Sequence, residues 1–139
     1  MGNSNNSNKC VFCDIVNVNK QKVVYENNEI SIFPSRSPIA DIHLLSVPKI
    51  HTKNINSLTR NDIGLLQNMK ATALKYILDT YPLIKESAVV FGFHIPPFNS
   101  VEHIHMHVLV PPYVNCCTKF WKVDVIMRSY DKVLNNLRA

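Results

Sequence analysis

Three histidines alternate with apolar residues in one short stretch of the chain, His103-Ile-His-Met-His-Val108. In an extended strand, alternate side chains point to the same face, so the imidazoles would lie side by side with the apolar side chains opposite them. Imidazole can ligate a metal ion, attack a phosphorus atom as a nucleophile, or donate a hydrogen bond to a phosphoryl oxygen. Because folding alone does not require this pattern, the stretch is the candidate site of chemistry.

Two kinds of chemistry are compatible with these histidines. In the first, His103, His105 and His107 together bind a zinc ion and leave its fourth position to water. Such sites usually draw on nearby carboxylates, which are sparse around this stretch. In the second, the middle histidine, His105, attacks phosphorus while its neighbours hydrogen-bond the oxygens where charge develops, and Ser100 offers a hydroxyl to the leaving group. The residues alone leave both interpretations open.

A histidine outside this stretch and the cysteines give weaker signals. A lone histidine such as His94 is usually a solvated or hydrogen-bonded side chain. Cys10 and Cys13 form a C-x-x-C pair, which can bind a metal, take part in redox chemistry, or be buried as reduced thiols. The adjacent pair Cys116-Cys117 is predicted to be reduced, because four cysteines in a chain of this type do not indicate a disulfide framework.

Length and composition predict one globular domain with an anionic ligand. The 139 residues are 46% hydrophobic and 18% charged, which is ordinary for a globular protein. The net charge of +5 suits an anionic ligand, but lysine and arginine are spread along the chain, so no dedicated nucleic-acid site is expected. No apolar run is long enough to span a membrane. Residues 1–9 are predicted to be a disordered polar tail, not a signal peptide, before one domain at 10–139, which predicts an intracellular protein, cytoplasmic or nuclear.

The pattern of apolar residues predicts an α+β domain with an antiparallel sheet. Four segments besides the histidine stretch are predicted to be strands, because they alternate or are short and apolar between turn residues. They lie at residues 23–26, 29–33, 43–47 and 88–93. With the histidine stretch they make a sheet of five strands, joined mainly by sequential hairpins.

Three segments are predicted to be helical. The clearest begins near Thr59, which would form a capping box with Asp62, carries apolar residues at steps of three and four, and ends before Pro82. A short helix or turn is expected at 11–18, and a C-terminal helix at 129–137.

Four segments together resemble the histidine triad superfamily, whose pattern is His-φ-His-φ-His-φ-φ with φ apolar. His103-Ile-His-Met-His-Val-Leu-Val110 matches that pattern, and His43-Leu-Leu-Ser-Val-Pro-Lys-Ile-His51 is similar to the family segment His-x-x-x-x-Pro-Lys-x-His. Cys10-Val-Phe-Cys-Asp-Ile15 resembles the opening of the Hint branch, and Gly92-Phe-His-Ile-Pro-Pro-Phe98 the loop of its third paralogue class. The resemblance covers residues 10–139. It implies a HIT-like fold with a five-stranded sheet, one long helix and a C-terminal helix, dimerising into a ten-stranded sheet.

The resemblance also implies an activity. Such a protein is a nucleotide-binding hydrolase or transferase that acts on nucleoside phosphoramidates or nucleotidyl conjugates through a covalent nucleotidyl-histidine. By carry-over, His105 is the nucleophile, His107 donates to a phosphoryl oxygen, and His43 supports the phosphate pocket. His103 completes the triad, and Ser100 stands beside the leaving group. Catalysis of this type needs no cofactor.

The same resemblance implies a nucleotide pocket and a metal site. Phe12, Ile15 and Phe33 match the apolar pocket for a purine base, and Asn99 stands where the family usually has glutamine. The ligand would be a purine nucleoside monophosphate or one of its conjugates. Some members also carry a structural zinc, and all four ligand positions are filled in this chain. They are Cys10, Cys13, His51 and His103.

The chain departs from the family pattern at the end of the strand that carries Phe33. Ser35 stands where the family usually places the acidic residue that accepts hydrogen bonds from the ribose hydroxyls, and Arg36 replaces an apolar residue of the base pocket. A serine offers the ribose one weaker hydrogen bond, whereas the arginine favours a more anionic ligand. These changes keep a second interpretation open, in which the protein binds nucleotides with little turnover.

Overall fold

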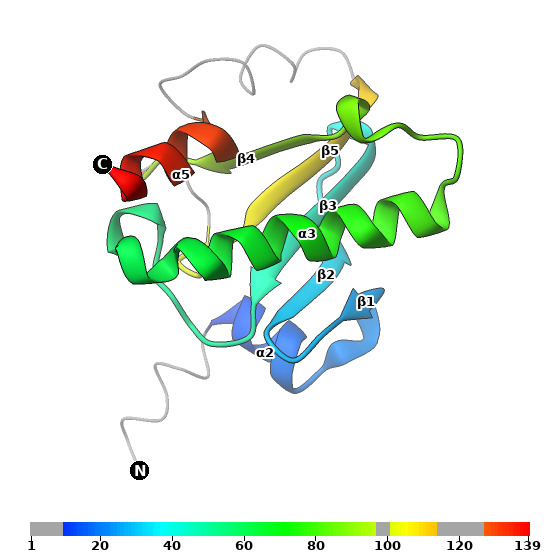
Figure 1. The fold of residues 1–139 in the computed structure, drawn as a ribbon. Coiled ribbons are helices and arrows are strands. Elements are labelled where there is room, and N and C mark those ends of the chain that lie inside the picture. Colours follow the sequence, from blue (N-terminus) through cyan, green and yellow to red (C-terminus); the bar gives the residue numbers. More distant parts are fainter. Residues whose placement is uncertain (1–9, 97–100, 114–126) are drawn as a thin grey trace.

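The structure is a computed structural model that describes residues 10–96, 101–113 and 127–139. Its described strands form one sheet in the order β1-β2-β3-β5-β4-β6, in which every neighbouring pair is antiparallel (Figure 1). The strands are β1 (Tyr25–Glu26), β2 (Ile30–Pro34), β3 (Ala40–Pro48), β4 (Val90–His94), β5 (Met106–Tyr113) and β6 (Met127–Ser129). The α-helices are α2 (Val11–Asn17), α3 (Ile63–Thr80) and α5 (Tyr130–Arg138). Single 3-10 turns are η1 (Lys20–Lys22), η2 (Ile55–Ser57), η3 (Arg60–Asp62) and η4 (Glu86–Ala88).

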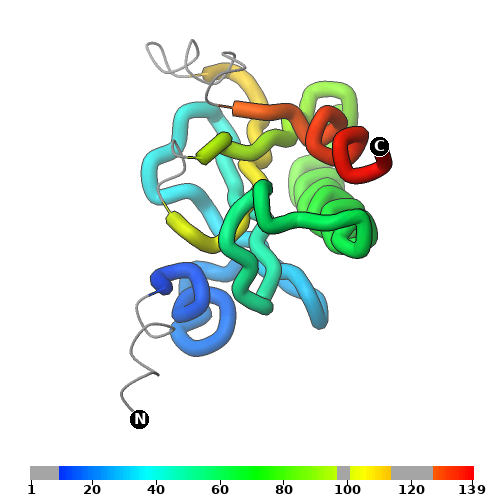
Figure 2. The backbone as a smooth tube through the Cα atoms, turned by 90° about the vertical axis from the view of Figure 1, so that its left-hand side faces the viewer, coloured from blue at the N-terminus to red at the C-terminus, as the bar shows by residue number. Residues whose placement is uncertain are grey.

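The sheet separates two layers of packing. The long helix α3 covers one face, where its buried side chains join Ile32, Leu44 and Val108 of three neighbouring strands in the main core. The short helix α2 packs on the opposite face, where Phe12 lies in a smaller core with Leu45. Figures 1 and 2 show the two helices on different sides of the strands. In the described part of the chain, none of the helices has the length and apolar character needed to cross a membrane.

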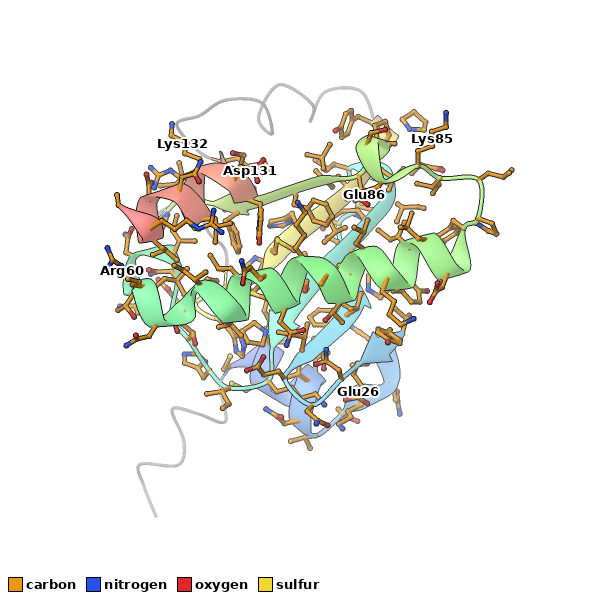
Figure 3. All side chains as sticks on the ribbon, viewed as in Figure 1. Glu26, Arg60, Lys85, Glu86, Asp131 and Lys132 are labelled. Atoms are coloured by element: carbon orange, nitrogen blue, oxygen red, sulfur yellow. The ribbon has the colours of Figure 1, made fainter. Side chains whose placement is uncertain are left out.

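The charged side chains labelled in Figure 3 lie around the rim of the α3 face and outside its centre. All of them are exposed, as expected for groups that water solvates better than a protein interior does. They are Glu26, Arg60, Lys85, Glu86, Asp131 and Lys132. The α3 face of the sheet is therefore the apolar core, and the candidate chemistry lies on the other face.

The register of the strands places a row of side chains on the α2 face. Phe33 of β2 pairs with Leu45 of β3, and Leu45 pairs with His107 of β5. Residues directly opposite each other on antiparallel strands point to the same face. The side chains of Phe33, Leu45 and His107 therefore form a row across three neighbouring strands.

The paired strand covers only part of the histidine stretch, which corrects the expectation that all of it is a strand. β5 begins at Met106, so His103 and His105 precede it and only His107 lies within it. The segment before β5 is held instead by the Ile104 N–H, which donates to the carbonyl oxygen of Thr52 at 2.6 Å. The predicted alternation is nevertheless confirmed, because Ile104, Met106 and Val108 all lie in the main core on the α3 face.

The sheet has six described strands, whereas five were predicted. The additional strand, β6, pairs with β4 at residues 92–94. Gly92 permits this close approach, because an added Cβ would meet the Met127 side chain and lie 3.2 Å from the carbonyl oxygen of Arg128. The antiparallel arrangement itself is confirmed. The pairing of two copies into a continuous sheet stays a prediction.

The predicted helix signals are confirmed with small shifts of the ends. Thr59 and Asp62 form the capping box, but it closes the turn η3, and α3 begins after it and ends before Pro82. Ser129 caps α5 by accepting a hydrogen bond from the Lys132 N–H. The N-terminal helix α2 lies within the predicted segment. The predicted tail at 1–9 lies outside the described residues.

Replacing Leu66 of α3 by alanine should lower the free energy of unfolding by about 2–5 kcal/mol, because it leaves a cavity in the main core. Leu66 is 0% exposed. Gln67→Ala on the exposed side of the same helix should change the value by less than about 0.5 kcal/mol. Urea denaturation of the wild type and both variants measures the free energy of unfolding of each. An equal loss of free energy in the two variants would contradict the assignment of the core.

Candidate functional site

Four imidazoles gather on the α2 face around His107, which is buried. The ring centroid of His107 lies 4.5 Å from that of His94, 5.1 Å from that of His105, and 5.2 Å from that of His43. These side chains come from β3, β4, β5 and the segment before β5. The sheet therefore brings together histidines that are far apart in the sequence, in one cluster centred on His107.

Hydrogen bonds set the tautomers of two of these histidines. The Ile39 N–H donates to Nδ1 of His43 at 3.1 Å, so the hydrogen of this neutral ring is on Nε2. Nε2 of His43 lies 2.9 Å from Nδ1 of His107 and donates to it. The hydrogen of His107 is consequently on Nε2, from which it can be donated to an oxygen.

His105 has the opposite tautomer. Its Nδ1 lies 2.7 Å from the carbonyl oxygen of His103, which can only accept, so Nδ1 carries the hydrogen. Nε2 therefore holds the lone pair. The Phe12 ring packs edge-on against the imidazole, with centroids 4.9 Å apart, and keeps the ring in this orientation. His105 thus has the tautomer of a nucleophile, and His107 that of a hydrogen-bond donor.

Burial keeps the cluster neutral. Desolvation is the main cause that lowers the pKa of His43 to about 4, and the neighbouring His94 and His105 lower it further. Desolvation likewise lowers the pKa values of His94 and His105, although the bond to the His103 carbonyl partly opposes the shift for His105. The pKa of His107 lies well below its ordinary value for the same reason, with contributions from the imidazoles around it. All four rings are neutral near pH 7, which both nucleophilic attack and the assigned tautomers require.

A cavity of about 500 Å³ opens beside His105 and His107. Cavities of this size accommodate small ligands such as a nucleotide. Its apolar wall includes the three residues predicted for a base pocket, Phe12, Ile15 and Phe33. Lys22, Ser35, Arg36 and Ser37 give the cavity a polar end. The cavity therefore joins reactive imidazoles to an apolar surface and a cationic edge.

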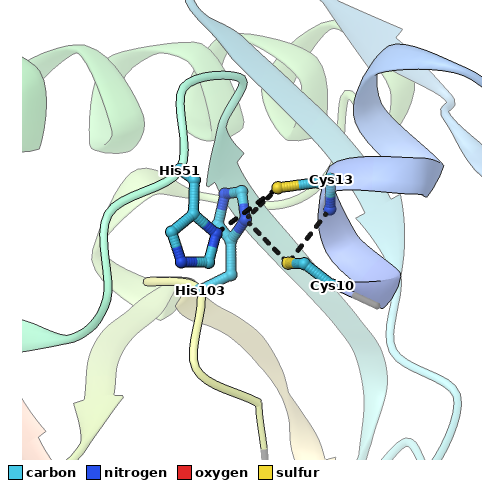
Figure 4. A group of neighbouring side chains, drawn as sticks. All are labelled: Cys10, Cys13, His51 and His103. Carbon is cyan, nitrogen blue, oxygen red and sulfur yellow. Dashed lines mark hydrogen bonds between the residues drawn. The ribbon is translucent and has the colours of Figure 1, made fainter. Parts of the chain in front are cut away.

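A second cluster lies on the N-terminal side of this site and could hold a metal ion (Figure 4). Its potential ligand atoms all lie within 4.8 Å of one another, and the residues are Cys10, Cys13, His51 and His103. Nδ1 of His103 is 3.4 Å from both sulfur atoms, and Nδ1 of His51 is 3.4 Å from Sγ of Cys13. Sulfur and nitrogen ligands of a tetrahedral zinc ion are about 3.6 Å apart, as its bond lengths of ~2.3 and ~2.05 Å dictate. The donor set and its spacing fit a tetrahedral metal site.

The surroundings of the cluster also suit a cation. Nε2 of His103 donates to the carbonyl oxygen of Pro48 at 2.7 Å, so the Nδ1 lone pair points at the sulfur atoms. Burial and the neighbouring Cys10 raise the pKa of the Cys13 thiol to about 11 in the absence of a metal. A bound cation would reverse this shift by stabilising the thiolates.

The structure thus divides the predicted triad. His105 and His107 lie at the cavity with His43, whereas His103 directs its side chain into the cysteine cluster. The three triad histidines cannot hold one zinc ion in this arrangement, because His103 faces the sulfur atoms and Nδ1 of His105 donates to a backbone oxygen. The zinc hydrolase interpretation is therefore not supported.

His94 is the site residue that the sequence interpretation missed. The sequence predicts an ordinary solvated or hydrogen-bonded histidine at this position, yet its ring packs on His107. Gly92 pairs with His107 across the strands, so His94, two residues further on, lies on the same face, and this pairing is visible only in the structure. The predicted site residues Ser100 and Asn99, and the pair Cys116-Cys117, lie outside the described residues.

Comparisons with known proteins show the family of the chain. The profile of the family described as scavenger mRNA decapping enzyme C-term binding matches residues 9–120. The bifunctional adenosine 5′-phosphosulfate phosphorylase/adenylylsulfatase HINT4 of Arabidopsis thaliana is 35% identical over 108 residues, 76% of this chain and 72% of that protein. A HIT family hydrolase from Legionella pneumophila has a TM-score of 0.67 at 31% identity, covering 75% of this chain and 94% of the other. The chain belongs to the histidine triad superfamily.

Its place within the superfamily is the Hint branch, in the third paralogue class. The adenosine 5′-monophosphoramidase HINT3 of Mus musculus is 33% identical over 110 residues, 77% of this chain and 66% of that protein. The resemblance inferred from the histidine stretch and the C-x-x-C opening is therefore confirmed.

Acid should destabilise this histidine triad protein through His43. Its pKa of about 4 in the folded chain lies below its ordinary 6.5, so between these pH values the unfolded chain binds a proton that the folded chain does not. The free energy of unfolding should fall as the pH drops from 6.5 to 4, by on the order of 3 kcal/mol for this residue.

Urea denaturation of the wild type and His43→Gln at pH 7.5, 5.5 and 4.5 measures this contribution. The free energy of unfolding of the variant should depend less steeply on pH, since the glutamine side chain does not titrate. The acid sensitivity of the cysteine cluster is common to both proteins and cancels in the comparison. Equal slopes would show that His43 is not held neutral by burial.

Proposed function

We propose that the protein hydrolyses nucleoside 5′-phosphoramidates or related nucleotidyl conjugates through a covalent nucleotidyl intermediate on His105. The supporting observation is the pairing of tautomers at the cavity, where His105 carries its lone pair on Nε2 and His107 its hydrogen on Nε2. One ring can attack phosphorus while the other donates to an oxygen. The name of the HINT3 relative, a monophosphoramidase, supports the same reaction class.

In the first step, Nε2 of His105 attacks the 5′ phosphorus and the P–N bond to the leaving amine breaks. The amine departs with the electron pair of that bond and takes up a proton. His107 donates its Nε2–H to a non-bridging oxygen, where negative charge develops in the transition state. The His105 ring becomes cationic when it is bonded to phosphorus, and its Nδ1–H donates to the His103 carbonyl, which stabilises that charge.

In the second step, water attacks phosphorus and the bond to Nε2 of His105 breaks. The electron pair returns to the imidazole, the proton of the water is released, and the nucleoside monophosphate leaves. His43 acts as a positioning residue, because its hydrogen bond holds His107 in the donor tautomer. The apolar wall formed by Phe12, Ile15 and Phe33 binds the base, and a purine has the larger surface to bury there.

Adenosine 5′-phosphoramidate should be hydrolysed by the wild type and not by His105→Ala, with a loss in kcat of roughly 10³-fold or more. The variant lacks the nucleophile but keeps the cysteine cluster, so its circular dichroism and melting should stay close to those of the wild type. Gln67→Ala, far from the cavity on α3, is the matched control and should keep full activity. Residual turnover by His105→Ala equal to that of the wild type would refute the nucleophile assignment.

A role in nucleotide binding with little turnover is the alternative. It is favoured by the absence of a carboxylate among the described residues that line the cavity, since the ribose then lacks a strong hydrogen-bond acceptor. Tight binding of AMP by a folded wild type that turns over none of the phosphoramidate would favour this role.

We also propose that the cysteine cluster holds a structural zinc ion. The support is its Cys₂His₂ donor set, the ligand spacing and the oriented His103 ring. Zinc there would tie the start of α2 to the loop after β3 and the segment before β5. The ion would have a structural role, and no step of the reaction above involves it.

The purified protein should contain one equivalent of zinc per chain by elemental analysis. Cys13→Ser should lose the metal and unfold more readily, because the site loses a thiolate ligand. His105→Ala should keep the metal, since His105 is not in the cluster. Loss of zinc from His105→Ala together with retention in Cys13→Ser would place the metal at the triad and refute the proposal.

A further inference from the structure

The cationic edge of the nucleotide cavity carries two positive charges that the proposed reaction does not use. Lys22 of η1 and Arg36, two residues past β2, both line the cavity. Among the described residues, the ion pairs involve other lysines, and Glu26 is taken by Lys20 and Lys49. Neither Lys22 nor Arg36 is paired with a carboxylate in this part of the chain. Their charges are therefore directed to a ligand or to solvent.

The fold brings the two cations to the same end of the cavity. Tyr25 pairs with Ile32, and the Val24 N–H donates to the Ile32 carbonyl oxygen at 2.9 Å, which continues the ladder beyond β1. Lys22 ends the turn η1, which leads into this edge of the sheet, and Arg36 follows the end of the neighbouring strand β2 by two residues. Both side chains line the cavity.

This end lies at a distance from the reacting imidazoles. β3 separates β2 from β5, so Phe33 and His107 are two strand spacings apart, or about 10 Å. Lys22 and Arg36 come from the chain next to β1 and β2, whereas His107 belongs to β5 and His105 immediately precedes it. A nucleotide bound with its 5′ phosphorus at His105 extends its base and ribose across this distance.

Ser35, which lies between the end of β2 and Arg36, is compatible with a bound anion. The hydroxyl of Ser35 accepts a hydrogen bond from the Ser37 N–H at 3.3 Å and can donate its own hydrogen to a ligand. A carboxylate at this position would repel a phosphate. Because Lys22 and Arg36 are exposed while the base needs the buried apolar wall, their partner is a hydrated anionic group at the rim of the cavity.

We propose that the preferred substrates carry a second phosphate on the ribose, at the 2′ or 3′ oxygen, and that Lys22 and Arg36 bind it. This inference rests on the proposed function for the reaction at the 5′ phosphorus and adds the class of nucleotide that is selected. Charge-assisted hydrogen bonds from lysine and arginine bind phosphate, and serine donates to it. Ser35, Lys22 and Arg36 are then specificity-determining residues.

The test compares adenosine 5′-phosphoramidate with its 3′-phosphorylated form as substrates, and AMP with adenosine 3′,5′-bisphosphate as ligands. The wild type should favour the 3′-phosphorylated member of each pair by about tenfold or more, in kcat/KM and in Kd. The double variant Lys22→Gln/Arg36→Gln should bring both ratios close to one. Ser35→Asp should invert them, because its carboxylate repels phosphate and accepts hydrogen bonds from a free ribose.

Lys20→Gln is the matched control, because it removes one positive charge two residues from Lys22 without touching the cavity. It should keep the wild-type ratios. Ratios near one for the wild type, with turnover of both substrates, would overturn this inference and leave the proposed function standing. Tighter binding of the bisphosphate with no turnover of either substrate would reject the proposed function and support the cationic subsite.

Discussion

The hydrogen bond from Nδ1 of His105 to the carbonyl oxygen of His103 is the interaction on which the site depends. It orients the His105 ring, decides which nitrogen holds the lone pair, and in the proposed reaction provides an acceptor for the ring when it becomes cationic. The same residue that supplies this carbonyl sends its own imidazole into the cysteine cluster and donates to Pro48. One short segment therefore links the reactive ring to the end of β3 and to α2. Any displacement of this segment would change the reactivity of His105 as well as its position.

A second constraint is burial. A cluster of imidazoles at the surface would titrate near neutral pH, and partly protonated rings could neither attack phosphorus nor keep a defined chain of donors and acceptors. Enclosure under α2 and within the sheet lowers the pKa of each ring, and the mutual repulsion of their charged forms adds to the effect. As a consequence, the folded protein becomes less stable as the pH falls. The site thus achieves neutrality by desolvation, with no carboxylate beside the imidazoles in the described residues to raise their pKa values again.

Much of the fold was predictable because its signals are local. The capping box at Thr59 and the serine cap of α5 depend on residues close in sequence, and the histidine pattern has few competing explanations. Periodicity predicted that Ile104, Met106 and Val108 share the core face, and they do. It could not show that His103 joins the cysteine cluster and not the cavity, because the partners of that cluster are distant in the sequence. β6 was missed for a related reason, since a three-residue strand is made by its partner β4 and not by its own pattern. His94 was missed because its role arises from a cross-strand neighbour.

The two ends of the cavity differ in a way that bears on selectivity. At the imidazole end, the rings are neutral and, in the proposed reaction, bind the phosphoryl group through hydrogen bonds, so affinity there should depend weakly on the charge of the ligand. At the opposite end, Lys22 and Arg36 provide fixed charge that no described carboxylate offsets. Binding free energy gained at the cationic end is present before and during the reaction, so it lowers KM, whereas donation from His107 grows as charge develops and raises kcat. Separating recognition from chemistry in this manner lets substitutions at Ser35 and Arg36 redirect substrate choice without altering the tautomers that make His105 reactive.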